Sequence, residues 1–102
     1  MHSRILLFVF TLLTLSILSY CSATLKIPTK ADSDFTGTSL DTLTNGRELY
    51  INSCGNCHNL HLPNERTKVE WSKTLGKMKI KAKTSEEQTG VILKYLEAYA
   101  KK

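Results

Sequence analysis

The chain has 102 residues, which leave room for one small domain at most and exclude a multidomain protein. It carries 14 lysines and arginines against 9 acidic residues, so its net charge is +5. No internal repeat, long low-complexity run or second cysteine motif is present, and this excludes a repeat architecture.

The N-terminus predicts export. Residues 1–4 carry one positive charge, and residues 5–18 are strongly apolar. This length and these flanks are typical of a secretory signal, and the stretch is too short to span a bilayer comfortably. We therefore predict a signal peptide over residues 1–20, with an uncleaved membrane anchor as the alternative.

Cys21 follows this signal directly. The stretch Leu18-Ser19-Tyr20-Cys21 resembles a bacterial lipoprotein signal, although Tyr20 stands where a small residue is usual. We expect lipidation of Cys21, which would hold the protein at a membrane from outside. The alternative is ordinary cleavage after Ala23, which would discard Cys21.

Residues 21–41 are rich in Ser, Thr, Asp and Gly and show no period of 3.6 or 2. This composition predicts a flexible polar tether. The folded domain is then expected over residues 42–102. About sixty residues form only a marginal core by themselves.

Two helices are predicted in the first part of this domain. One covers residues 43–53, with Thr42 or Thr44 as its N-cap. Another covers residues 67–75, between a capping box at its first and fourth residues and the following Gly76.

A third helix is predicted from Thr84, where the capping-box signature recurs. Its apolar stripe consists of Val91, Ile92, Tyr95, Leu96 and Tyr99. No segment alternates like a strand. The sequence therefore predicts an all-α domain of about three helices.

The most informative motif is Cys54-Gly55-Asn56-Cys57-His58, because C-x-x-C-H is the attachment sequence for c-type haem. The thiols of Cys54 and Cys57 can each add to one haem vinyl group, and His58 is then held beneath the iron as its proximal ligand. The export signal places the motif where such attachment occurs. We expect one covalent haem c, with its iron.

Other uses of these cysteines are less favoured. With His61, the motif could form a four-ligand zinc cluster, but four ligands within eight residues depart from the spread-out spacing of structural zinc sites. A thioredoxin-type dithiol is expected within a βαβ pattern, and the sequence shows no such pattern.

Residues around the motif extend the comparison to a family. Gly46 and Tyr50 stand eight and four residues before Cys54, and Ile92 and Tyr95 lie on the last predicted helix. In this arrangement the domain resembles a small class I cytochrome c. The resemblance implies that the first helix crosses the last one almost at a right angle, with the glycine allowing close approach.

The resemblance also implies a distal iron ligand ahead of the last helix. Met78 is the only methionine left once the signal is removed, and it lies 20 residues after His58. A thioether would raise the haem potential. This step is short for the family and would leave the haem edge open. The rivals are a five-coordinate iron, His61, or a lysine near Met78.

Two further residues have roles implied by the family. Pro63 resembles the proline whose carbonyl accepts the N–H of the proximal histidine. Trp71 is expected to pack on the haem or to donate to a propionate, with plain core packing as the alternative.

The implied function is a single-electron carrier in the periplasm, at the outer surface of a membrane, and not an enzyme. Lysines around Met78 would steer acidic redox partners, unless they are simply a solvated face; they are Lys73, Lys77, Lys79, Lys81 and Lys83. Nucleic acid is not an expected partner. The alternatives are a haem protein with an open distal site, acting as a peroxidase-like enzyme or diatomic-gas sensor, and a haem-free metal or thiol protein.

Overall fold

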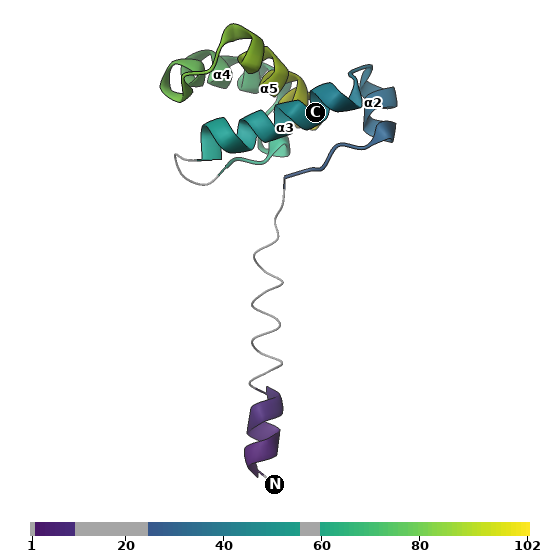
Figure 1. Cartoon of the computed structure of the whole chain (residues 1–102), viewed down its shortest axis with the longest axis vertical. Coiled ribbons are helices and arrows are strands. Elements are labelled where there is room, and N and C mark those ends of the chain that lie inside the picture. The colour runs from purple at the N-terminus through teal and green to yellow at the C-terminus, as the bar shows by residue number, and fades with distance from the viewer. Residues whose placement is uncertain (1, 10–24, 56–59) are drawn as a thin grey trace.

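The structure is a computed structural model, and it describes residues 2–9, 25–55 and 60–102 (Figure 1). Residues 2–9 are helical, and the following elements are α2 (Lys30–Thr36), α3 (Leu40–Cys54), the 3-10 helix η3 (Pro63–Glu65), α4 (Lys68–Ala82) and α5 (Glu86–Ala98). No strand occurs in these ranges. The all-α class is confirmed, but the described residues hold more helices than the three predicted, because α2 precedes them.

Helices α3 and α5 form the centre of the domain (Figure 1). Gly46 marks the point of closest approach, since a Cβ atom there would lie 2.5 Å from the Val91 carbonyl oxygen and 2.7 Å from the Tyr95 Cβ. The close approach that the sequence comparison implied at Gly46 is therefore present, and its partner on α5 includes Tyr95.

Helix α4 completes the core by packing on α5. Trp71 and Leu75 are its buried residues, and the Trp71 ring meets Tyr50 of α3 edge to face, with ring centroids 6.1 Å apart. The other buried apolar residues come from the N-terminal segment, α3 and α5; they are Leu25, Leu43, Ile92, Tyr95 and Leu96. Three helices thus share one small core that is rich in aromatic rings.

Capping residues fix where the helices begin. Thr67 and the carboxylate of Glu70 form the predicted capping box of α4. The box of α5 starts at Ser85 rather than Thr84, and α3 begins earlier than predicted because Ser39 is its N-cap. Each shift arises because several serines and threonines near the helix start could serve as the N-cap. The backbone conformation in the folded protein decides which of them does so.

Helix α4 does not end before Gly76 as predicted. Gly76 is exposed and helical, and the helix continues to Ala82. Lys83 then adopts a left-handed φ of 55°, and its backbone N–H donates to the Lys79 carbonyl. An interior glycine costs a helix only about 1 kcal/mol relative to alanine, so one glycine does not stop it.

The segment predicted to be a flexible tether over 21–41 is folded in its described part. Leu25 is buried, and the Tyr95 hydroxyl donates to the Lys26 carbonyl at 2.8 Å. The Tyr99 hydroxyl donates to Asp32 of α2, also at 2.8 Å. These partners lie almost seventy residues away in sequence, so local composition could not reveal them.

The C-terminus is tied back to the start of α4, because the Lys101 N–H donates to the Arg66 carbonyl at 2.9 Å. Across the described ranges, no helix is long and apolar enough to cross a membrane. Cys21 and most of the predicted signal peptide lie outside these ranges.

Candidate functional site

The cysteine motif begins at the last residue of α3. Cys54 is half-buried and packs against the core, and Gly55 caps the helix by donating its N–H to the Ile51 carbonyl. Cys57 and His58 lie outside the described residues. The first thiol of the motif is therefore held at the end of a helix that packs closely on α5 at Gly46.

The chain re-enters the described structure beside the same helix. Leu60 and Leu62 are half-buried against the core. The Tyr50 hydroxyl donates to the His61 carbonyl at 2.7 Å, and burial raises the pKa of Tyr50. This bond joins the chain after the motif to α3, one turn before Cys54.

His61 itself faces solvent. Its side chain is exposed, and its Nδ1 lies 3.2 Å from a carboxylate oxygen of Glu65. The same carboxylate accepts the Leu62 N–H at 2.7 Å and so caps η3. His61 is thus a surface histidine engaged with its own turn.

Pro63 and Trp71 are brought together by a direct hydrogen bond. The Trp71 indole N–H donates to the Pro63 carbonyl at 2.7 Å, and the ring is only 1% exposed. The Arg66 guanidinium lies 5.0 Å from the ring centroid on its face. The Trp71 ring is therefore packed in the core, and its N–H is engaged by the Pro63 carbonyl.

The Pro63 carbonyl can still accept a second hydrogen bond, because a carbonyl oxygen has two lone pairs. Its implied partner, His58, lies outside the described residues. The hydrogen bond from Trp71 holds this carbonyl in place. Pro63 is buried, as a residue next to the core should be.

Met78 lies inside α4, not in a loop after it. It is half-buried and lines an open cavity of about 230 Å³, together with Lys73, Thr74, Lys77 and Lys81. At helical spacing, Met78 falls on the same side of α4 as Trp71. Met78 is therefore a half-buried residue that lines the cavity.

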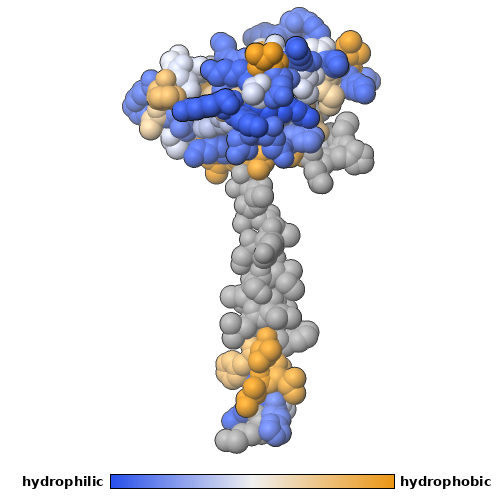
Figure 2. Space-filling model, turned by 180° about the vertical axis from the view of Figure 1, so that it is seen from behind, coloured by the Kyte–Doolittle hydropathy of each residue, from blue (hydrophilic) through white to orange (hydrophobic). Residues whose placement is uncertain are grey.

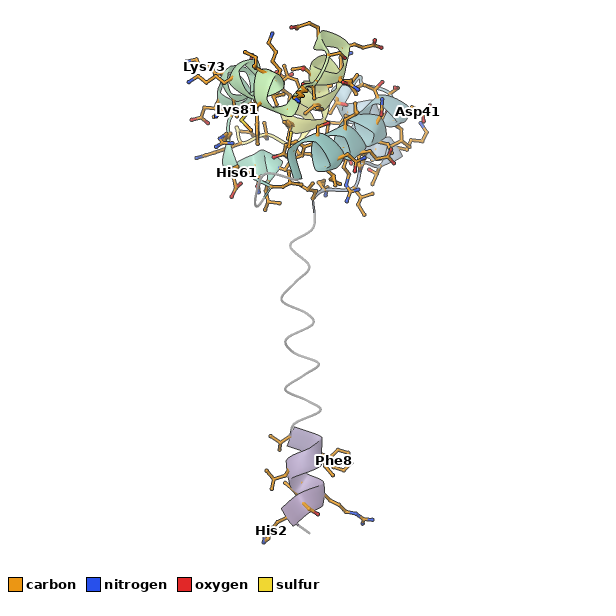
Figure 3. The ribbon with its side chains drawn as sticks, turned by 60° about the vertical axis from the view of Figure 1, so that its left-hand side comes forward. His2, Phe8, Asp41, His61, Lys73 and Lys81 are labelled. Atoms are coloured by element: carbon orange, nitrogen blue, oxygen red, sulfur yellow. The ribbon has the colours of Figure 1, made fainter. Side chains whose placement is uncertain are left out.

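The five lysines near Met78 do not form one ring. Lys73, Lys77 and Lys81 recur every four residues and line the cavity, where all three are exposed (Figure 3). We call these three the lysine cluster. Lys79 instead pairs with Glu86 at 2.6 Å, and Lys83 forms the C-cap of α4.

Three features that a haem site needs are found at separate places, since Cys54, Leu60 and Leu62 do not line the cavity beside Met78. Cys54 presents a thiol at the edge of the core, Leu60 and Leu62 add apolar surface beside it, and Met78 supplies a soft sulfur donor next to a cavity. Within the described ranges, no three His, Cys, Asp or Glu side chains gather where they could hold a metal ion.

Comparisons of the chain with protein-family models, with curated proteins and with solved structures give no significant match.

Proposed function

We propose that the protein is a monohaem c-type cytochrome that carries single electrons outside the cytoplasm. The observation that carries this proposal is the C-x-x-C-H motif placed directly at the end of α3, the helix that Gly46 packs closely on α5. A haem bonded there would be attached to a helix at the centre of the domain.

In this proposal, Cys54 and Cys57 hold the haem through thioethers, and His58 is the proximal ligand. A bound haem c supplies a centre that gains and loses one electron. The protein contributes the attachment points, apolar surface and control of the axial ligands. Pro63 positions His58 by accepting its ring N–H, which raises the basicity of the ligand.

Met78 is the proposed distal ligand. Its half-buried position beside the cavity supports this role, because a fully buried methionine would be committed to core packing. The lysine cluster shares the cavity, so a lysine amine is the structural rival for the same coordination position.

The lysine cluster is the proposed docking surface for acidic redox partners. Its three side chains are exposed on one side of α4, and no ion pair among the described residues joins any of them to a carboxylate. Such a surface raises the rate of encounter with acidic proteins and makes that rate sensitive to salt. We place the protein at the outer surface of a membrane, held by acyl chains on Cys21.

The distal ligand is tested by absorption spectroscopy of the purified holoprotein. The ferric wild-type protein should show the weak long-wavelength band of methionine–iron ligation. Met78→Ala should lose this band and gain carbon monoxide binding in the ferrous state. Leu75→Ala removes a buried residue one turn earlier on α4, and it is the control that should retain the band.

A haem protein with an open distal site is the second candidate function. The observation that favours it is that Met78 sits within a regular helix next to open space, rather than in a loop folded over the site. A wild-type protein that is already high-spin and binds carbon monoxide would select this function over the electron carrier.

A further inference from the structure

The folded domain begins very close to the proposed lipid anchor. Leu25 is already buried against the core, and the next residue, Lys26, is held through its carbonyl by Tyr95 of α5. Only residues 22–24 separate Cys21 from Leu25. The chain between an acylated Cys21 and the domain is therefore very short.

Covalent geometry limits what this short connection allows. The step from Cys21 to Leu25 spans at most about 14 Å even when it is fully extended. A compact domain of about 80 residues is roughly 30 Å across. A domain anchored at Cys21 therefore cannot turn its opposite side to the bilayer, and the side that carries residues 25–29 has to face the lipid.

The chain between Cys21 and the domain cannot easily become longer by detachment of the segment that follows Leu25. Beyond Leu25, the segment is held to the domain by the Tyr99–Asp32 hydrogen bond. Releasing it would expose Leu25 and break hydrogen bonds to both Tyr95 and Tyr99. The segment is a fixed part of the domain.

The surface next to Leu25 has a composition that suits a lipid headgroup region. Ile27 is 65% exposed, and its neighbour Lys26 is exposed as well. An apolar side chain beside a cation can insert at the bilayer boundary while the charge stays among the headgroups. The face of the domain that is seen from behind in Figure 2 is mostly hydrophilic, with scattered apolar residues.

The start of α4 lies near residues 25–29, because Lys26 lines one cavity with Pro63, whose carbonyl accepts the Trp71 N–H. The rest of α4 runs away from residues 25–29 (Figure 1). Lys73 and Lys81 are accordingly found far from the start of the folded domain in Figure 3. The lysine cluster would then point away from a membrane that meets the domain at Ile27.

We propose that the face around Lys26 and Ile27 rests on a phospholipid bilayer and that the lysine cluster is turned to the aqueous side. This orientation rests on the proposed lipidation of Cys21. It selects the kind of partner, namely an acidic protein that approaches from solution and not one embedded at the level of the lipid headgroups.

The test compares two exposed isoleucines, Ile27 and Ile80, which are 65% and 76% exposed. Each is changed to cysteine in the lipidated holoprotein and labelled with a fluorophore. The protein is placed in vesicles of phosphatidylethanolamine and phosphatidylglycerol that contain a headgroup-linked nitroxide quencher. Quenching at position 27 should exceed that at position 80 by about threefold or more, because the short connection fixes the orientation.

A matched variant carries about twenty added Gly and Ser residues after Ala23, which give a reach of roughly 25 Å. It should lose most of the difference between the two positions. Equal quenching without this insertion would overturn the proposal, and so would mass spectrometry showing that Cys21 is removed. The haem absorption of the same samples reports on the proposed cytochrome independently of either result.

Discussion

The two ends of the candidate site are built in different ways. On one side, α3 and α5 meet so closely at Gly46 that no other residue fits, and the interface is filled by buried apolar side chains. On the other side, the second half of α4 presents exposed lysines and a half-buried Met78 to an open cavity. The first region specifies the fold, while the second leaves polar and soft donor groups available for chemistry.

The largest effect is expected where the packing is tightest. Gly46→Val would place its Cβ against the Val91 carbonyl and force α3 and α5 apart. We expect the free energy of unfolding to fall by about 3 kcal/mol or more, since overpacking a dense interface is costly. Urea denaturation of the holoprotein measures this.

The matched control is Gly76→Ala, because a Cβ at Gly76 meets nothing within 4 Å. Alanine is the better helix former, so stability should rise by about 0.5–1 kcal/mol. If both substitutions had similar effects, the contrast between the two regions would be lost.

A smaller effect is expected at the junction of the two regions. Trp71→Phe keeps an aromatic ring but removes the N–H that donates to Pro63, which leaves a buried carbonyl without this partner. The loss of stability should be about 1–3 kcal/mol by thermal or urea unfolding. Val69→Ala, at an exposed position of the same helix, should change stability by less than about 0.5 kcal/mol.

The smallest effect on stability is expected from the hydrogen bond between Tyr99 and Asp32. The hydrogen bond from Tyr99 is the main cause that lowers the pKa of Asp32 below 3.8, and burial, followed by the bond to Asp32, raises the pKa of Tyr99 above 10.0. The lowered carboxyl pKa means that this contribution is present above about pH 4 and is lost as the pH falls further. The raised phenol pKa means that it is also lost as the pH rises above about 10.

The contribution of this hydrogen bond is measured by the protection of the α2 amides from hydrogen exchange as a function of pH. Protection in the wild-type protein should decline at both extremes, whereas Tyr99→Phe should show weaker protection at neutral pH and a flatter profile. Identical profiles for the two proteins would show that Asp32 and Tyr99 do not hold the segment.

Several of these features could be predicted from the sequence because their signals are local. The Thr67–Glu70 capping box marks the start of α4, and Gly46 falls where the resemblance placed it on α3. The length of α4 was missed because Gly76 suggested a stop, although one exposed glycine in a helix is tolerated at modest cost.

The folded segment before α3 could not be predicted in the same way. Its composition is polar, and the groups that hold it, Tyr95 and Tyr99, lie at the other end of the chain. A signal was nevertheless present, because Thr29 and Asp32 have the spacing of a capping box. At the candidate site, the roles of Cys54 and Met78 stay predictions, and the sequence did not indicate that Met78 lies within a helix and shares its cavity with three lysines.

The central claim is the covalent attachment of one haem to the motif, and intact-mass spectrometry combined with the absorption spectrum tests it most directly. The wild-type protein and a Cys54→Ala, Cys57→Ala double variant are each expressed and exported in a host that carries haem-attachment machinery. We expect the wild-type chain to gain the mass of one haem and a c-type spectrum, and the double variant to gain neither. A wild-type chain of unmodified mass without haem absorption would contradict it.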